Sequence, residues 1–162
     1  MNAFYRSRFF PITGLMLGMI VWLASNANPQ NANTGAPFDG HCQNCHGGNN
    51  PGGFGGTVEI SGLPSTIEPN TLYPMTITLT PTAGSPVKGG FQLVVVNGSN
   101  GNAGDLAAVN AQAGTEFAGG REYIDHRNGK TFVGGGPVSW NFNWTSPAVA
   151  AGNTIKVYFI GN

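Results

Sequence analysis

The chain is poor in charge and in cysteine. Only 9% of its 162 residues are charged, with seven basic against seven acidic side chains. A chain without a basic surplus lacks the electrostatic footprint of a nucleic-acid-binding protein, so no nucleic acid is expected as a partner. Serine-elbow and H-E-x-x-H motifs are also absent. Their absence removes the sequence signatures of two common hydrolase classes.

The first 27 residues have the three parts of a secretory signal peptide. Arg6 and Arg8 precede an apolar run over residues 9–24, and the small residues 25–27 follow. The run is short for a membrane span and contains proline and glycine, which disfavours an anchor. We expect cleavage after Ala27 and export to the periplasm, the cell surface or the medium. The mature chain would keep five basic and seven acidic residues, because two of the seven basic residues lie in the leader.

Both cysteines lie in one five-residue run, Cys42-Gln43-Asn44-Cys45-His46. A C-x-x-C-H run is the attachment signature of c-type haem, in which each thiol adds to one vinyl group and the histidine binds the iron. The sequence therefore predicts one covalent haem c on Cys42 and Cys45, with His46 as the proximal iron ligand. Export agrees with this interpretation, because bacterial c-type haem is attached outside the cytoplasm.

Two other interpretations of this run stay open. The two thiols could form a local disulfide or a redox dithiol, although the usual helix N-terminus within a βαβ pattern is missing. A zinc site could use Cys42, Cys45 and His46, with His41 or His126 as the fourth ligand. A structural zinc site usually combines two well-spaced ligand pairs, and a second pair is missing here.

Residues 28–56 are rich in proline, glycine and asparagine and show no apolar period. The stretch 47–56, GGNNPGGFGG, cannot form a helix interior, because glycine costs about 1 kcal/mol per helical residue. We therefore expect an irregular haem-attachment arm rather than a helical cytochrome. The arm offers only Phe38 and Phe54 as apolar cover for a haem, so a folded domain must supply the rest, through residues such as Phe117, Tyr123 or Trp140.

The sixth position of the iron has two candidate ligands. His126 is the first, a histidine near the end of a predicted strand that could instead hydrogen-bond within the sandwich edge. Met75 is the second, but it alternates with Ile77 and Leu79, so a place in the core is preferred for it. Asp125 adjoins His126 in sequence, yet neighbouring residues of a strand point to opposite faces. The sequence therefore makes His126 the better candidate metal ligand.

The remainder, residues 57–162, predicts an all-β domain. Short segments with strand patterns alternate with glycine-rich and asparagine-rich turns, and no helix is expected apart from a short turn near 104–112. The expected strands are 57–61, 73–80, 91–96, 138–144 and 154–160. Segment 91–96 is apolar on both faces, which suits a central strand. Trp140, Phe142 and Trp144 share one face and are expected between two sheets. The predicted fold is an immunoglobulin-like antiparallel β-sandwich.

Several segments follow one another in a recognisable order. They are Leu72–Pro74, Gly89–Leu93, Tyr123–His126 and Phe142–Pro147, followed by Gly152 and Val157–Phe159, with Thr34–Pro37 and the C-x-x-C-H run ahead of them. This order resembles reeler-like domains and, more narrowly, the secreted bacterial choice-of-anchor V domain. The resemblance covers about residues 34–162. It implies a reeler-like sandwich behind the haem-attachment arm and supports His126 as that family's recurrent histidine.

Two features depart from the pattern of that family. Residues 125–127, Asp-His-Arg, stand where the family more often has His-Thr or His-Ser. The family also usually continues beyond the position of Asn162 with a further strand and an anchoring tail. We therefore expect a truncated gene product, and the sequence leaves the mode of anchoring open.

These observations predict a secreted monohaem protein for extracytoplasmic electron transfer. Its partner would be a redox protein or a neighbouring haem protein. The alternative is an extracellular adhesion, structural or self-assembling surface module with a Cys42–Cys45 disulfide and no haem. A non-enzymatic carrier or binding module is favoured over an enzyme.

Overall fold

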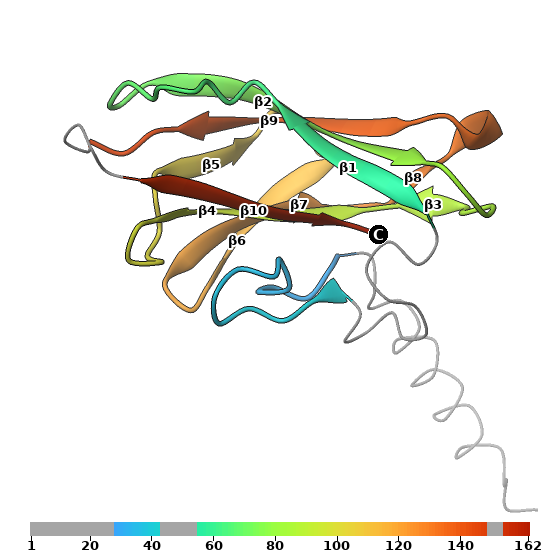
Figure 1. The fold of residues 1–162 in the computed structure, drawn as a ribbon, viewed down its shortest axis with the longest axis horizontal. Helices are drawn as coiled ribbons and strands as arrows, with labels where there is room; N and C mark the ends of the chain where they lie inside the picture. Colours follow the sequence, from blue (N-terminus) through green and yellow to red (C-terminus); the bar gives the residue numbers. More distant parts are fainter. Residues whose placement is uncertain (1–27, 43–54, 149–153) are drawn as a thin grey trace, which may run out of the picture.

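The computed structural model describes residues 28–42, 55–148 and 154–162. In these residues the chain forms ten strands and a short 3-10 turn, η2, over Val133–Gly135, and Cys42 at the edge of the first range is also in 3-10 conformation (Figure 1). The strands are β1 (Gly56–Ser61), β2 (Leu72–Pro81), β3 (Lys88–Gly89), β4 (Phe91–Asn97), β5 (Asp105–Ala108), β6 (Ala113–Ala118), β7 (Arg121–His126), β8 (Lys130–Thr131), β9 (Val138–Thr145) and β10 (Ile155–Gly161). The five expected strands are therefore confirmed within one or two residues at each end.

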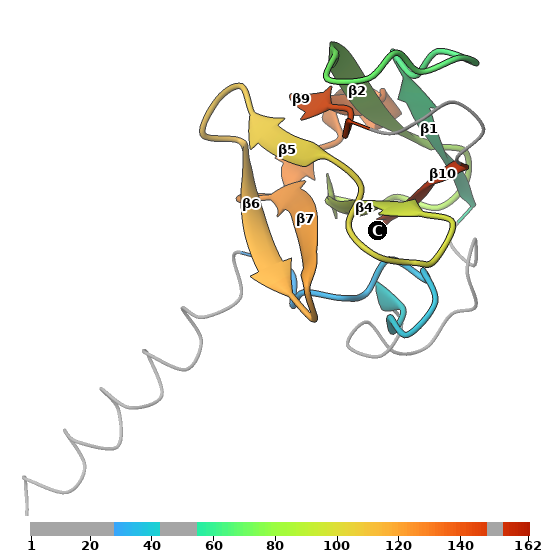
Figure 2. The ribbon, with the colours of Figure 1, turned by 90° about the vertical axis from the view of Figure 1, so that its left-hand side faces the viewer.

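Two four-stranded sheets lie face to face (Figure 2). One has the order β1-β2-β9-β5 and the other β10-β4-β7-β6, while β3 and β8 form a small ribbon. Every pairing is antiparallel. Packing two such sheets buries one face of each, which is the architecture of a β-sandwich. The predicted all-β antiparallel sandwich is confirmed.

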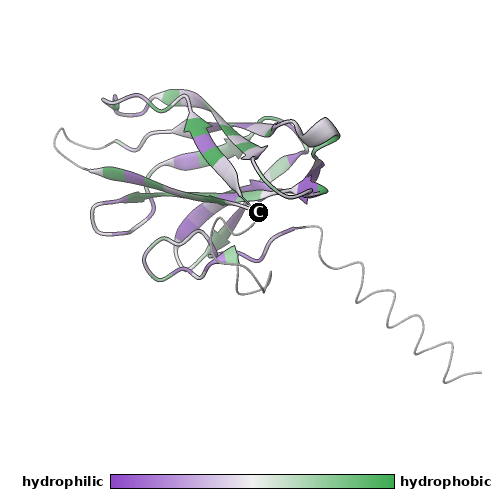
Figure 3. Cartoon of the chain, turned by 45° about the vertical axis from the view of Figure 1, so that its right-hand side comes forward, coloured by the Kyte–Doolittle hydropathy of each residue, from purple (hydrophilic) through white to green (hydrophobic). Residues whose placement is uncertain are grey.

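The core lies between the sheets and follows the period-two alternation of the strands, which the hydropathy colours display (Figure 3). Met75 and Ile77 of β2 stand opposite Phe142 and Trp140 of β9 in the strand register. All four side chains are at most 2% exposed. Full burial of such side chains contributes about 1.5–3 kcal/mol each. The core positions predicted for Met75 and for the tryptophan-phenylalanine stripe are confirmed.

Strand β4 is buried on both faces, as expected for a central strand. Phe91, Leu93 and Val95 belong to the inter-sheet core, whereas Val94 and Val96 belong to a second apolar cluster on the outer face. That second cluster includes Ala36, from residues 28–42 at the start of the described chain. These residues lie against the outer face as a third layer (Figure 2).

The structure differs from the sequence-based expectation between residues 104 and 112. Residues 105–108 form β5 at the edge of the first sheet, paired with β9, and the expected short turn is limited to residues 109–112 between β5 and β6. Leu106 is the only buried residue of β5, so the strand carries almost no alternating pattern. Strands β6 and β7 form a hairpin whose turn, Gly119-Gly120, has positive φ at both residues.

Some expectations concern residues outside the described ranges. The leader, 1–27, lies outside them, and so do Cys45, His46 and Phe54. Within the ranges that are described, no helix is long and apolar enough to cross a membrane.

Candidate functional site

Residues 28–42, called the arm from here on, form a closed loop of chain rather than an extended tail. Thr34 and His41 make an isolated antiparallel bridge, and the Gly40 amide donates to the Ala32 carbonyl at 2.8 Å. The Thr34 hydroxyl donates to Asp39 Oδ2 at 2.6 Å across the loop. These bonds give the arm a defined shape without a helix or a regular strand.

A buried ion pair fixes the arm to the second sheet. Arg121 Nη1 on β7 lies 3.1 Å from Asp39 Oδ1, and the two side chains are only 8% and 2% exposed. The same Nη1 donates to the Pro37 carbonyl at 2.8 Å, and Nε donates to the Asn100 carbonyl at 2.8 Å. The Tyr123 hydroxyl donates to Asp39 Oδ1 at 2.9 Å. Charge-assisted bonds of this kind are stronger than neutral ones, so they hold the arm in one position.

Burial raises the pKa of Tyr123 above its ordinary value of 10.0, and the hydrogen bond and charge of Asp39 add to the shift. Arg121 opposes them. The phenol therefore stays protonated at neutral pH and donates its hydrogen bond to the carboxylate.

A second attachment uses Gln92, a fully buried polar residue on the outer face of β4. Gln92 Oε1 accepts from the Asn33 amide at 2.8 Å, and Nε2 donates to the Gln30 carbonyl at 3.0 Å. The side chain thus satisfies two backbone groups of the arm, which buried polar groups require. Together, Gln92 and Arg121 fasten both halves of the arm.

Phe38 is the outermost part of the arm. Its side chain is 93% exposed, and its φ of +74° lies in the left-handed region that a bulky residue rarely adopts. The Arg121 guanidinium carbon lies 5.8 Å from the ring centroid, a cation–π distance. The role of Phe38 as apolar cover for a haem stays a prediction.

The structure separates the first cysteine from the expected second iron ligand. Cys42 lies in the arm on the outer side of the second sheet, with Sγ 3.8 Å from the Asn33 carbonyl. His126 lies on the opposite face of β7, where its ring neighbours Phe91 and Trp140 in the core. His126 Nδ1 is within 2.9 Å of the Phe91 amide and 3.0 Å of its carbonyl. Iron binding by His126 stays a prediction. Its Nδ1 is within hydrogen-bond distance of the Phe91 backbone.

The other three aromatic residues expected to cover a haem lie in different parts of the domain. Tyr123 is buried beneath the arm and Trp140 is buried between the sheets, whereas Phe117 on β6 is 69% exposed. In the described part of the chain, no three His, Cys, Asp or Glu side chains gather closely enough to hold a metal ion. The zinc interpretation depends on Cys45 and His46, which lie outside that part.

Asp125 is the other charged group under the arm. It points to the outer face of β7, opposite to His126, as the strand alternation predicted, and it is fully buried. Neither carboxylate oxygen makes a hydrogen bond of good geometry with a described residue, and Arg127 Nη1 lies 3.8 Å away. The pKa of Asp125 is raised to about 6, mainly by burial. The Arg127 charge lowers it, the Glu116 charge raises it, and the neighbouring Gln92 side chain lowers it slightly.

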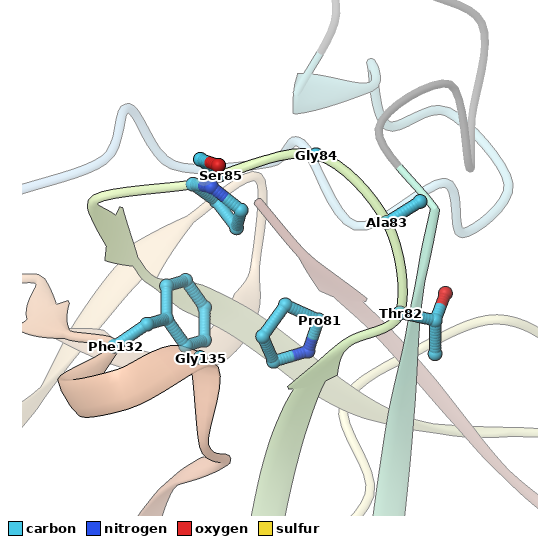
Figure 4. A pocket seen from close by; sticks show the side chains of 8 residues that line it. Pro81, Thr82, Ala83, Gly84, Ser85, Phe132 and Gly135 are labelled. Atoms are coloured by element: carbon cyan, nitrogen blue, oxygen red, sulfur yellow. The ribbon is translucent and has the colours of Figure 1, made fainter.

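One shallow hollow lies at the end of the sandwich near the β2–β3 loop (Figure 4). Its volume is about 350 Å³, and Pro81, Pro86 and Phe132 contribute apolar walls while Thr82 and Ser85 contribute hydroxyls. No titratable side chain lines it. The hollow is therefore not an acid–base site.

The sequence did not reveal the residues that fasten the arm, Asp39, Arg121 and Gln92. One signal was available. The run 91–96 was apolar on both faces except for Gln92, so something had to cover the outer face of that strand and satisfy the glutamine.

Comparison with known proteins finds likeness only among solved structures. No protein family and no curated protein matches the sequence. The Reelin-N domain of F-spondin is 18% identical over 65% of this chain and 71% of its own, with a TM-score of 0.42. Two structures of the human F-spondin reeler domain are 18% and 17% identical, with TM-scores of 0.38 and 0.39. They cover 65% and 74% of this chain, and 77% and 84% of their own chains. These three structures are reeler domains, and their likeness says nothing about a haem motif or a choice-of-anchor V domain.

Proposed function

We propose that this protein is an exported, non-enzymatic module with an adhesive or structural role outside the cytoplasm. The observation that carries the proposal is Phe38, which a rigid loop holds out into solvent. An exposed aromatic ring that a buried arginine supports is suited to be an interface anchor, since aromatic residues dominate binding hot spots. The positive φ of Phe38 is energetically unfavourable, and such strain in a well-fixed loop is typical of functional positions.

The arm and the sheet contribute to this contact point together. Arg121 lies beneath the ring, and its guanidinium is fixed by Asp39 and by the Pro37 and Asn100 carbonyls. A pre-ordered anchor loses little conformational freedom on binding, which favours affinity. The partner is a protein surface with an apolar recess, either on a neighbouring cell-surface protein or on another copy of this chain.

The test compares the exported protein with its Phe38→Ala variant. We expect retention on the producing cells, or self-association in sedimentation experiments, to weaken by about 10- to 30-fold, the loss typical of an anchor residue. Val133→Ala is the matched control, because Val133 is 84% exposed in η2 and lies outside the arm. Equal binding by the Phe38→Ala protein and the wild type would contradict the proposal.

A second candidate function is electron transfer by a haem c on Cys42, Cys45 and His46. The observation in its favour is that the arm holds Cys42, the first residue of the motif, in a defined place on the domain surface. A bound haem would supply a one-electron redox centre, and the domain would position it for a redox partner. His126 stays the expected second ligand of this candidate. Its Nδ1 serves the Phe91 backbone, so iron binding would fall to Nε2, the arrangement usual for a metal-bound histidine.

Absorption spectra and mass decide between the two candidates. Haem gives a pyridine-haemochrome spectrum and a haem mass increment in a host with haem-maturation machinery, and Cys42→Ala removes both. A disulfide gives a colourless protein that is lighter by two hydrogens. A His126→Ala variant is expected to change the coordination class of the haem spectrum if His126 is the second ligand, and an unchanged spectrum would remove it from that role.

A further inference from the structure

The buried carboxylate of Asp125 lacks a dedicated cationic partner. Its side chain is fully buried, and both oxygens are without a hydrogen bond of good geometry to the described residues. Arg127 is the nearest cation, at 3.8 Å, which is beyond hydrogen-bond distance. A buried, uncompensated carboxylate is strongly unfavourable, so a further positive group would stabilise this place in the fold.

Arg127 cannot serve Asp125 alone, because other groups hold its guanidinium. Arg127 Nη2 lies 2.8 Å from Glu116 Oε1 and donates to the Thr115 carbonyl at 3.0 Å. Its guanidinium also packs over Gly114, which stands opposite Asp125 in the β6–β7 register. The arginine is thus directed mainly towards β6, and Asp125 stays underpaired.

The first described residues of the arm lie at this same place. With its amide oriented to satisfy both groups, the Asn28 side chain donates to the Arg127 carbonyl at 2.9 Å and accepts from Arg127 Nη1 at 3.1 Å. The Gln30 carbonyl accepts from Gln92, which stands opposite Asp125 in the β4–β7 register. Asn28 and Gln30 therefore contact the two outer-face neighbours of Asp125, and two residues of chain span at most about 7 Å.

We propose that cleavage of the leader after Ala27 completes this site, and that the new α-ammonium group of Asn28 pairs with the carboxylate of Asp125. The cleavage is a hydrolysis by an export-pathway peptidase. Water adds across the Ala27–Asn28 peptide bond and leaves a carboxylate on Ala27 and an ammonium group on Asn28. In the uncleaved chain the same nitrogen is a neutral amide. Processing thus supplies the missing cation and locks the arm onto the sheet.

The facing groups agree with this assignment. Arg127 and Glu116 form their own pair on the β6 side, and Asn28 is neutral in its side chain. Gln92 on the β4 side is neutral and bonded to the arm, and its side chain is the smallest influence on the Asp125 pKa. The α-ammonium is the one positive group that processing adds at this place. The pair would fasten the beginning of the arm as the Asp39–Arg121 pair fastens its turn.

The experiment exports two versions of the full chain from a bacterial host. One is wild type, and the other carries Gly-Ser inserted between Ala27 and Asn28, so that its amine stands two residues away. Mass spectrometry first defines both N-termini. We expect the wild-type α-amino group to titrate at least one pH unit above its ordinary value of about 7.7–8.0, because the carboxylate stabilises its charge. Exchange of the Asn33 and Gly40 amides is expected to be about tenfold slower than in the insertion variant.

Asp125→Asn tests the identity of the partner. In that background the two N-termini should titrate alike and protect the arm alike, whereas Glu116→Gln, the matched control, should preserve the difference between them. An ordinary α-amino pKa in the wild type, or equal arm protection in both versions, would overturn the proposal. A mature chain that begins at a residue other than Asn28 would overturn it as well. If Asp125→Asn fails to fold, the comparison of the two N-termini still decides the matter.

Discussion

Asp39 and Arg121 lie 82 residues apart in the chain and meet in a 3.1 Å ion pair that is nearly closed to solvent. The pair joins the arm to the second sheet and makes the molecule a structure of three layers rather than two. Because breaking a buried pair leaves one charge uncompensated, the two residues are more strongly coupled than a surface pair would be.

Replacing Arg121 by Met should release the arm. The Asp39 carboxylate would remain buried without its cation, at a cost of about 3–5 kcal/mol if the arm stayed in place. Undocking lets water reach the carboxylate, so we expect the arm to open while the sandwich stays folded. Hydrogen exchange should show loss of protection at the Asn33 and Gly40 amides and little change in β4. Lys88→Met, an exposed cation on β3, is the control, and arm protection equal to wild type in the Arg121 variant would refute the prediction.

The stability of variants at residue 38 should depend on how well the new residue tolerates the positive φ at this position. Its φ of +74° suits glycine, whereas a β-branched residue is strained there. We expect Phe38→Gly to be more stable than Phe38→Val by about 1–2 kcal/mol, since the left-handed conformation costs about that much for a residue with a side chain. Urea unfolding of the two variants measures the difference. Equal midpoints would show that the loop does not impose this φ.

Gly90 keeps space for the His126 ring. A Cβ at residue 90 would lie 2.2 Å from His126 Cε1, so Gly90→Ala must displace the imidazole from the Phe91 backbone. We expect a loss of about 1–3 kcal/mol, the usual cost of overpacking a well-filled site. Gly98→Ala is the control, because a Cβ there meets nothing within 4 Å. Thermal unfolding and the NMR signals of His126 report the effect, and a neutral Gly90→Ala would mean that the ring does not occupy this place.

The pH dependence of stability should depend on what precedes Asn28. In a chain whose amine is displaced, Asp125 has a pKa of about 6 in the folded state against 3.8 in the unfolded state, because burial opposes its charge. The folded state then binds the extra proton, so stability is full below about pH 3.8 and falls as the pH rises to about 6. A shift of this size corresponds to about 3 kcal/mol.

Asp125→Asn should remove that slope, and denaturant unfolding at a series of pH values measures it. The comparison uses the Gly-Ser insertion variant as the parent, so that only the carboxyl group changes. A slope of the same size with asparagine at this position would assign the pH dependence to another group.

The strands could be predicted where one face is buried, and the arm could not. Strands β2 and β9 alternate between apolar core residues and polar outer ones, so Met75 and Trp140 were placed correctly from the pattern alone. The arm has no such pattern, since its position depends on single polar residues such as Asp39 and Gln92 that meet partners far along the chain. Edge strand β5 escaped prediction for a related reason, because it buries one side chain only.

The candidate site could be predicted in its chemistry but not in its layout. The C-x-x-C-H run defined which residues could carry a haem, and strand alternation correctly placed Asp125 and His126 on opposite faces of β7. Strand alternation could not show that the arm with Cys42 covers the outer face of β7, whereas His126 lies on its core face. That relation depends on tertiary packing, which no local pattern encodes.

The arm is synthesised before every strand to which it is fastened. Its partners on β4 and β7 lie 59 to 84 residues later, so the ribosome must complete most of the second sheet before residues 28–42 have a surface to cover. Any enzyme that acts on the thiol of Cys42 therefore meets an open peptide first and a fastened loop later. The interval between these two states sets the time available for that chemistry.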